Sequence, residues 1–354
     1  MRAGLVWRLR ANQKGAGRIP MAETGRSLYL PPMNPPGTTD HLAGQFRRFA
    51  ESEAAGRSPL YEALALGVAA DPAILALLAD LPPEKRQPNL LFAAWRVHFG
   101  VPESFARFRA RLLADPAPVL ATIRARRTQT NEAGRCAVLL PILARLHQPL
   151  ALIEVGASAG LCLNPDHYAY DYAGTRLGPD DAPVLSCEPR SGVPIPAALP
   201  RIAWRAGLDL EPITTRDQDS LAWLEALIWP DQADRLARFR AAVELLRRNP
   251  VRLRQGDLTT DLTELLREAP VGPTLVVFHT ATLAYVRDPD ARAAFASTLW
   301  ENSAVWISNE APMAFPEIAA RASRPGPKGA FLLSVNGEPM AWTDPHGAWI
   351  DWLA

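Results

Sequence analysis

The feature that most restricts the fold is an apolar run that ends in small residues. Leu150–Val155 (LALIEV) is followed directly by Gly156–Gly160 (GASAG). A continuous apolar run of this length is typical of a strand buried on both faces of a parallel sheet. An acidic residue, then small residues, then a helix would place backbone N–H groups where a nucleotide-like ligand approaches such a sheet. The junction therefore predicts a parallel α/β sheet with a ligand site after its first strand.

The remainder of the chain repeats this alternation of strand and helix. Further strand-like runs occupy 251–254, 274–278 and 304–308, and helical patterns occupy 220–228, 231–248, 260–268 and 288–301. Strands that alternate with helices of about ten residues favour right-handed crossovers and a mostly parallel sheet. The tail differs, because two apolar runs flank Asn336-Gly337, a pair typical of a hairpin turn. We expect a Rossmann-like domain of the S-adenosylmethionine-dependent methyltransferase type over 149–354, ending in an antiparallel edge.

The part before Pro149 has a different pattern of apolar residues. From 37 to 148 the apolar residues recur at helical spacing and the breaks fall at prolines. Ser58-Pro59 and Asp71-Pro72 each combine a capping side chain with a proline at the first helical position. We predict about six short helices that form an N-terminal segment or cap, preceded by a flexible leader over 1–36.

Composition restricts the class of protein. The net charge is +1, but residues 1–150 hold 20 basic and 11 acidic residues against 18 and 26 in 151–354. The basic first part could meet an anionic substrate, or the two parts could simply attract each other. Three cysteines without metal-ligand spacing, and the lack of a signal-like or membrane-length apolar run, predict a cytoplasmic protein without a metal site or membrane association. No basic surface interleaved with aromatic residues suggests nucleic-acid binding.

Three interpretations of the GASAG loop must be weighed. The S-adenosylmethionine pattern fits, except that Ser158 replaces its middle glycine. A dinucleotide fingerprint would need glycine at 158 and 161, where Ser158 and Leu161 stand. The loop also matches the GxSxG nucleophile elbow of α/β-hydrolases, with Asp257 or Asp288 and then His346 in the required order. Against the hydrolase, its elbow normally follows several strands, whereas here it follows the first.

Several motifs together resemble one protein family. They are QTNE with Arg135 (129–135), LIEVGASAGL (152–161), YAYDY (168–172), GLDLEP (207–212), LIWPDQADR (227–235), QGDL (255–258), VVFHTATLAYV (276–286) and PHGAWIDWL (345–353). The sequence resembles the bacterial DUF2332 proteins over roughly 40–354. The resemblance implies a helical N-terminal part and a methyltransferase-like domain, and it implies no particular reaction.

The expected cofactor site is drawn from the loops after the strands. We predict that S-adenosylmethionine is bound by Glu154, Gly156, Ser158, Gly160, Asp209 and Asp257. Glu154 would hold the amino group or organise the loop, and Asp209 would bind the ribose hydroxyls, with Asp171 as the competing candidate. Asp257 follows a strand, where it could reach the adenine amino group or merely begin the next helix.

The expected chemistry lies at the end of the most apolar strand. His279 could accept a proton from the methyl acceptor, with Tyr285 lining the same pocket, or it could be a buried histidine satisfied by a neighbour. A polar stretch before the first strand is predicted to cover the cofactor or to receive the substrate: Arg127, Gln129, Asn131, Glu132 and Arg135. The sequence thus favours a methyltransferase of unknown acceptor. A non-catalytic protein of the same fold that binds a nucleotide-like ligand or a partner is the alternative, and oligomeric state is left open.

Overall fold

A computed structural model describes residues 38–129, 131–286 and 288–353. The predicted leader over 1–36 lies outside these residues. Helical elements fill the first part of the described chain: α1 Thr38–Phe49, a π-helical turn Ala50–Ala54, α2 Pro59–Ala69, α3 Pro72–Ala79, a 3₁₀ turn Pro83–Lys85, α4 Pro88–Phe99, α5 Phe105–Ala114 and α6 Ala117–Ala125. The predicted helical segment is thus confirmed for these residues.

Local sequence explains where these helices begin. The Ser58 side chain accepts a hydrogen bond from the backbone N–H of Tyr61 at 3.1 Å, and Asp71 accepts from the N–H groups of Ala73 and Ile74. These bonds satisfy donors that the first turn of a helix leaves unpaired. The apolar faces of α1–α6 form one core of their own, which includes Phe46, Phe92 and Phe108 and extends to Trp223 of the following domain.

A nine-stranded mixed sheet forms the second part, in the order β5-β12-β11-β10-β9-β8-β1-β6-β7. Its strands are β1 Leu150–Val155, β5 Glu188–Arg190, β6 Ile202–Asp209, β7 Arg252–Gln255, β8 Thr274–Thr280, β9 Val305–Glu310, β10 Phe331–Val335, β11 Glu338–Thr343 and β12 Trp349–Trp352. The five strands from β7 to β9 pair in parallel, and β9 to β12 pair antiparallel. The chain is therefore a mixed α/β protein with a helical N-terminal part and a large, mostly parallel sheet.

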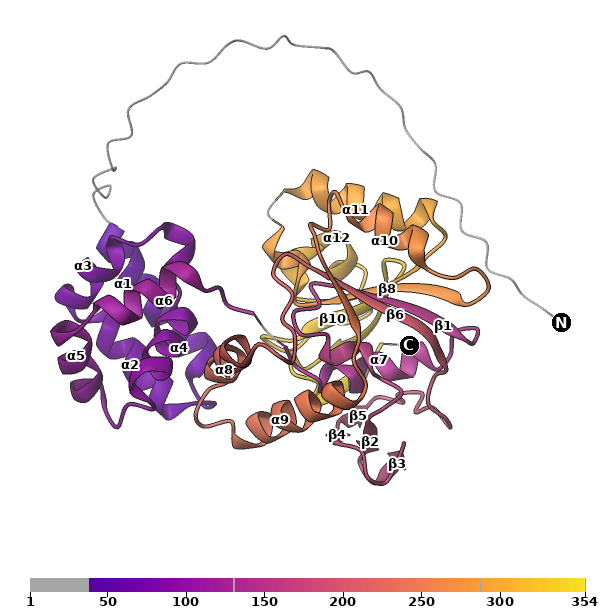
Figure 1. Ribbon diagram of the computed structural model, residues 1–354, viewed down its shortest axis with the longest axis horizontal. Coiled ribbons are helices and arrows are strands. Elements are labelled where there is room, and N and C mark those ends of the chain that lie inside the picture. The colour runs from indigo at the N-terminus through magenta and orange to yellow at the C-terminus, as the bar shows by residue number, and fades with distance from the viewer. Residues whose placement is uncertain (1–37, 130, 287, 354) are drawn as a thin grey trace, which may run out of the picture. The chain divides into compact units, whose positions relative to one another are not determined.

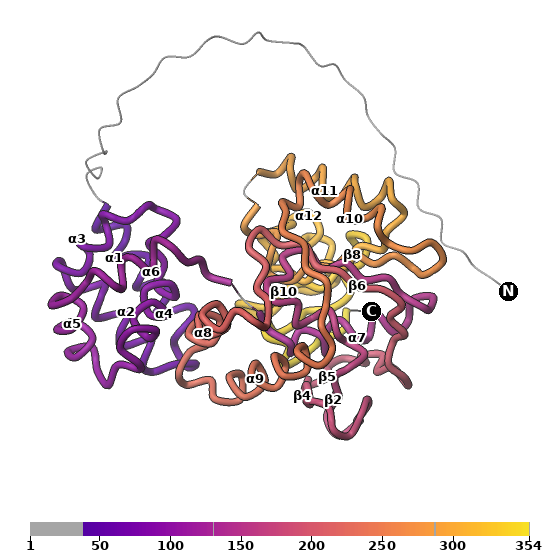
Figure 2. Tube along the Cα trace, in the orientation of Figure 1, coloured from indigo at the N-terminus to yellow at the C-terminus, as the bar shows by residue number. Residues whose placement is uncertain are grey.

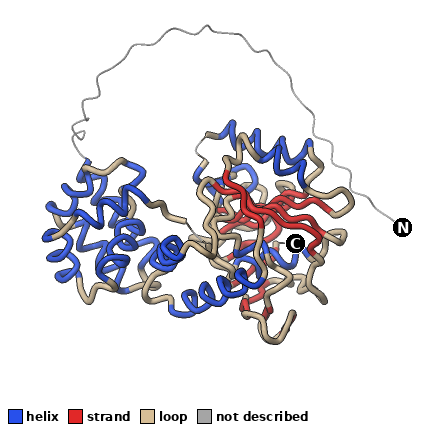
Figure 3. Tube along the Cα trace, in the orientation of Figure 1, coloured by secondary structure: helices blue, strands red, loops and turns tan. Residues whose placement is uncertain are grey.

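Helices cover both faces of the sheet (Figures 1 and 3). They are α7 Arg135–Leu143, α8 Gln218–Leu227 and α9 Ala233–Arg248 on one face, and α10 Leu262–Glu268, α11 Pro289–Glu301 and α12 Pro316–Ala319 on the other. Alternate residues of β1 supply the two cores: Leu150 and Leu152 face the first, and Ile153 and Val155 face the second. Burial on both faces explains why β1 is apolar throughout.

Two regions differ from the expectation. The helix predicted directly after the GASAG loop is absent, and a single 3₁₀ turn, Leu161–Leu163, stands there instead. Asn164-Pro165 follows, and a residue before proline is disfavoured in the helical conformation. The proline-rich stretch that follows forms a small sheet of β2 Ala169–Tyr172, β3 Thr175–Leu177 and β4 Val184–Ser186. Tyr168, Tyr170 and Tyr172 alternate into the core beneath it.

The helical segment joins the sheet domain through α8 and the loop after it. Arg96 of α4 donates hydrogen bonds to the backbone oxygens of Ala226 and Ile228, and Trp229 donates to Asn89 at 2.9 Å. Trp229 also packs against Phe49 and Tyr61. The chain crosses between the two parts over residues 126–129, which Figure 2 shows as an extended stretch after α6.

Candidate functional site

A cleft of about 620 Å³ lies at the carboxyl ends of the parallel strands. It is lined by residues that follow four strands and by residues of the helical segment: Glu84, Lys85, Gln87, Leu90, Arg127, Thr128, Gln129, Val155, Gly156, Ser158, Leu208, Asp209, Leu210, Glu211, Gly256, Leu258, Thr280, Ala281, Thr282, Ala284 and Tyr285. Strands β6 and β7 lie on one side of β1, and β8 and β9 lie on the other. The cleft thus sits where the strand order reverses, the position at which open α/β sheets bind ligands.

The loop after β1 has the backbone of a glycine-rich loop. Gly156, Ser158 and Gly160 all have positive φ, at 73°, 49° and 77°. Ser158 therefore adopts the conformation of the glycine that it replaces, at a cost of about 1 kcal/mol. The two glycines make room for protein rather than for ligand, since a side chain on Gly156 would meet Thr282 at 2.3 Å and one on Gly160 would meet Val251 at 2.8 Å.

Glu154 lies beneath this loop and is not among the residues that line the cleft. The side chain is buried, and its Oε2 has no hydrogen-bond partner among the described residues. Burial, followed by the neighbouring Cys162, raises the pKa of the Glu154 carboxyl well above its ordinary value. A cationic group beside this carboxyl would oppose that shift and lower its pKa.

The three aspartates of the predicted site have different positions. Asp209 ends β6 and lines the cleft, and its two oxygens accept hydrogen bonds from the N–H groups of Ser158 at 2.7 Å and Glu211 at 2.8 Å. Asp257 instead stabilises the turn before α10, where its Oδ1 accepts hydrogen bonds from the backbone N–H and the hydroxyl of Thr259. Asp171 accepts from the N–H of Gly174 in the small sheet, outside the cleft lining. Asp209 thus lies where a ligand can reach it.

His279 does not reach the cleft. Its Nε2 accepts a hydrogen bond from the indole N–H of Trp306 at 2.9 Å, and its Nδ1 contacts Glu310 Oε1 at 2.7 Å. Both nitrogens are therefore engaged, and the ring is completely buried beside Phe295 and Phe315. In this arrangement the imidazole carries its proton on Nδ1 and cannot receive one from an acceptor in the cleft. Tyr285 does line the cleft and is 67% exposed.

Glu310, at the end of β9, was missed by sequence reasoning. Its Oε1 also accepts hydrogen bonds from the backbone N–H groups of Thr282 at 2.7 Å and Leu283 at 3.0 Å. The carboxylate therefore holds the loop 280–285, which forms one wall of the cleft. The signal was present in the sequence, since Glu310 ends β9 as Asp209 ends β6, and Glu154 is the penultimate residue of β1.

The polar stretch 127–135 divides into three parts. Arg127 and Gln129 line the cleft, and Gln129 Nε2 donates to the backbone oxygen of Glu211 at 3.1 Å. Asn131 donates to the backbone oxygen of Ala157 at 3.3 Å and so supports the GASAG loop. Glu132 and Arg135 are buried, and Arg135 donates to the backbone oxygens of Pro345 and Thr280.

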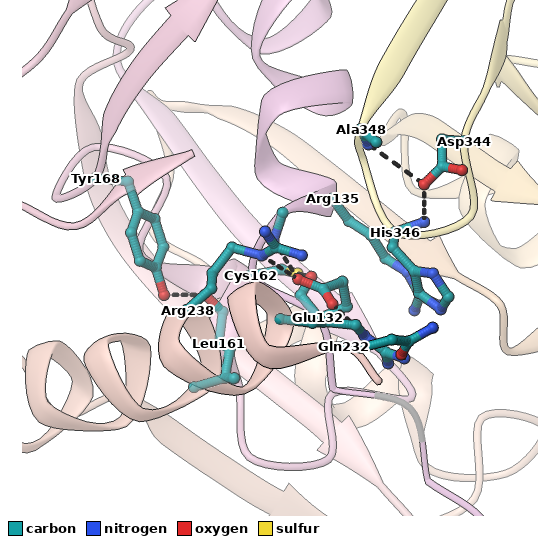
Figure 4. A network of polar contacts seen from close by, with 12 residues as sticks. Glu132, Arg135, Leu161, Cys162, Tyr168, Gln232, Arg238, Asp344, His346 and Ala348 are labelled. Carbon is teal, nitrogen blue, oxygen red and sulfur yellow. Dashed lines mark hydrogen bonds and ion pairs between the residues drawn. The ribbon is translucent and has the colours of Figure 1, made fainter. Parts of the chain in front are cut away.

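Glu132 is the centre of a buried ionic network. Figure 4 shows its carboxylate near Arg238, Gln232 and His346. Arg235 and Arg238 of α9 bind its two oxygens at 2.6 and 2.7 Å. Burial opposes ionisation of Glu132, but the two guanidinium groups outweigh burial and lower the pKa of the carboxyl to about 2. This network joins α9 to the segment before α7. Both oxygens of Glu132 are occupied within it, so this residue has a structural role rather than a role in binding a ligand.

A serine hydrolase finds no support in the geometry. The Ser158 hydroxyl is buried and has no hydrogen-bond partner among the described residues. Asp288 caps α11 through the N–H of Asp290, and Asp257 is engaged in its own turn. Burial, followed by the charge of Arg235, lowers the pKa of His346 well below its ordinary value, within the Glu132 network. A nucleophilic serine requires a base within hydrogen-bond reach, and Ser158 has none there.

The residues that the structure describes contain no group of three or more His, Cys, Asp or Glu side chains that could hold a metal ion. No single helix among them is long and apolar enough to cross a membrane. Taken together, α2 and α3 have the length and apolar composition of a membrane span, although the chain bends by 85° between the two helices.

Fold and site together define an α/β protein with a cleft at the carboxyl edge of its parallel strands. The chain belongs to the DUF2332 family, described as an uncharacterized protein conserved in bacteria, whose family model matches residues 43–352. No curated protein gives a match. A solved structure of a possible exported protein from Bordetella parapertussis is 12% identical, covering 79% of this chain and 74% of that one, with a TM-score of 0.25.

Proposed function

We propose that the protein is an S-adenosylmethionine-dependent methyltransferase whose cofactor lies in the cleft. The observation that carries the proposal is the position of Asp209, at the end of β6 and at the point where the strand order reverses. Numbered along the chain, the five parallel strands have the order 3-2-1-4-5 of a doubly wound sheet, in which ligands bind outside the carboxyl ends of the strands. This topology supports a Rossmann-like fold.

The residues present fit such a cofactor. A cleft of about 620 Å³ is within the range of sites for small organic ligands. Each Asp209 oxygen accepts one backbone hydrogen bond and has a further lone pair, so the carboxylate can also accept hydrogen bonds from ribose hydroxyls. Glu154 is buried outside the cleft lining, so it would organise the loop after β1 rather than touch the cofactor. The bound cofactor would supply an electrophilic methyl group, and the chain would orient the acceptor towards it.

A second candidate is a non-catalytic protein that binds a nucleotide-like ligand in the same cleft. The enclosure of His279 favours it, because the predicted proton acceptor is sealed between Trp306 and Glu310. For a methyltransferase, Tyr285 is the remaining predicted catalytic residue on the cleft. The two candidates agree on the ligand site and differ in whether S-adenosylmethionine is converted.

Replacement of Asp209 by Asn is expected to weaken binding of S-adenosylhomocysteine by roughly ten- to a hundredfold, since a hydrogen bond to a charged group contributes about 1.5–3 kcal/mol. Titration calorimetry measures the dissociation constant. Asp180→Asn is the matched control, because Asp180 is exposed and lies outside the cleft lining. Equal affinity in Asp209→Asn and the control would remove Asp209 from the site.

Two further outcomes separate the candidates. If the unaltered protein takes up neither S-adenosylmethionine nor S-adenosylhomocysteine at millimolar concentration, the methyltransferase proposal fails. If it binds both, S-adenosylmethionine is incubated with the protein and a bacterial small-molecule extract, and formation of S-adenosylhomocysteine is measured. Binding without turnover would favour the non-catalytic candidate.

A further inference from the structure

A smaller pocket of about 290 Å³ adjoins the cleft and has a different character. It shares Arg127, Gln129 and Glu211 with the cleft, so the two spaces have a common wall. The other lining residues are Arg126, Pro212, Ile213, Ser220, Trp223 and Gln255. Two arginines therefore line a small pocket in which Glu211 is the one acidic residue among the described lining.

The backbone that presents these arginines is fixed at successive positions. Lys85 Nζ donates to the backbone oxygen of Arg126 at 2.6 Å, and the indole N–H of Trp223 donates to that of Arg127 at 2.8 Å. Thr128 then donates to the side chain of Gln87 at 3.0 Å. Residues 126–129 have no regular secondary structure, and ordering such a stretch costs conformational entropy that these hydrogen bonds must offset. The linker is thus held in one conformation that places both arginines at the pocket.

The contacts found among the described residues use only part of the donors of the two guanidinium groups. Arg127 is 60% exposed, and its Nε lies 3.7 Å from Glu211, longer than the 2.7–2.9 Å of a charge-assisted hydrogen bond. Arg126 donates through one nitrogen to Ser220 at 2.9 Å. Burial, followed by the charge of Arg127, lowers the pKa of Lys85. Lys85 and Arg127 therefore lie close together in the cleft wall that adjoins the pocket, with Glu84 and Glu211 also near Lys85.

We infer that the small pocket binds an anionic group, a carboxylate or a phosphate, of the molecule that enters the cleft. A planar guanidinium presents paired donors that match the geometry of both groups. The carboxylate of Asp209 and the cations of residues 85, 126 and 127 would divide the site into a part for the nucleoside and a part for an acidic acceptor. The role as an acceptor site rests on the proposed function, whereas anion binding does not.

The test uses inorganic phosphate and acetate as probes on the full chain. Thermal unfolding is followed at constant ionic strength, with chloride as the reference, in the unaltered protein and in Arg126→Gln, Arg127→Gln and Arg124→Gln. The last variant is the matched control, since Arg124 is an exposed residue on α6 outside the pocket. Because a ligand of the native state raises the unfolding midpoint, phosphate or acetate should do so in the unaltered protein and in the control.

We expect at least a tenfold loss of anion affinity in Arg127→Gln, and a corresponding loss of the midpoint shift in Arg126→Gln. A shift with phosphate alone identifies a phosphorylated acceptor, and one with acetate alone a carboxylic acid. Equal shifts in all four proteins, or no shift beyond chloride, would overturn the inference. Arg127 is largely exposed, so its variant keeps the test valid if Arg126→Gln does not fold.

S-adenosylhomocysteine is titrated into the same proteins, so that the two proposals fail separately. Phosphate could raise the unfolding midpoint in an Arg127-dependent manner while S-adenosylhomocysteine does not bind. That result would support the anion site and refute the methyltransferase proposal. The reverse result would leave the cofactor site and remove the anion site.

Discussion

Replacement of Glu132 by Ala is expected to lower the free energy of unfolding by about 3–5 kcal/mol, the cost of leaving buried cations without their partner. Arg235 and Arg238 both bind this carboxylate, and their side chains are only 12% and 25% exposed. The Glu132 carboxylate also accepts the backbone N–H of Gly134 at 2.9 Å. Urea unfolding followed by circular dichroism measures the difference.

Glu225→Ala is the matched control for this experiment. Glu225 of α8 also binds an arginine of α9, Arg240, but that arginine is 61% exposed. An ion pair of this kind contributes about 0–1 kcal/mol. A loss in Glu132→Ala no larger than in Glu225→Ala would mean that the buried network does not stabilise the fold.

The same network gives a pH dependence of stability. The native pKa of Glu132 is about 2, below the ordinary value of 4.5, a difference that corresponds to about 3 kcal/mol. A depressed carboxyl pKa stabilises the folded state above the ordinary value, and this contribution is lost as the pH falls from about 5 towards 2. The stability difference between the unaltered protein and Glu132→Gln should therefore shrink between pH 7 and pH 3. A constant difference over that range would contradict the assignment.

Elements whose pattern is local were predictable from the sequence. The apolar run 150–155 became β1, and Asn336-Gly337 became a hairpin turn with positive φ at both residues. The helix expected after Gly160 was wrong, because Asn164-Pro165 ends any helix there after one turn. The small sheet was missed, although tyrosines alternate with other residues in Tyr168–Tyr172, which is a strand pattern.

The candidate site was predictable only where strand ends supply it. Asp209 follows from the rule that parallel strands end at one edge of a sheet. The partnership of His279 with Glu310 could not be predicted in the same way, because it depends on the β8–β9 register that places His279 opposite Ser308. Likewise, one polar stretch supplied both cleft residues and the buried Glu132, since neighbouring residues in an irregular segment point to different surroundings.

Glu310→Leu is expected to open the wall of the cleft and to abolish ligand binding there. One carboxylate oxygen accepts from His279 Nδ1 and from the N–H groups of Thr282 and Leu283. Leu removes the acceptor and leaves these buried donors unpaired, at a cost of about 1–3 kcal/mol each. Glu310→Gln retains an oxygen at the same place and should preserve the loop. Glu310 is thus a positioning residue that acts through the loop 280–285.

Hydrogen exchange distinguishes this local role from general destabilisation. The amides of Thr282 and Leu283 should lose protection in Glu310→Leu and regain it in Glu310→Gln, while the amides of β1 and β6 stay protected. Across the variants, the affinity for S-adenosylhomocysteine should change with the protection of these loop amides rather than with the free energy of unfolding. Glu317→Leu, at an exposed position of α12, controls for the change of residue type. Unchanged protection of the loop in Glu310→Leu would refute the assignment, because no other side chain among the described residues accepts a hydrogen bond from these two amides. If the loop loses protection and binding is lost together, Glu310 of β9 positions this wall of the cleft. The buried His279 then also has a role, because its imidazole orients the Glu310 side chain that holds the loop.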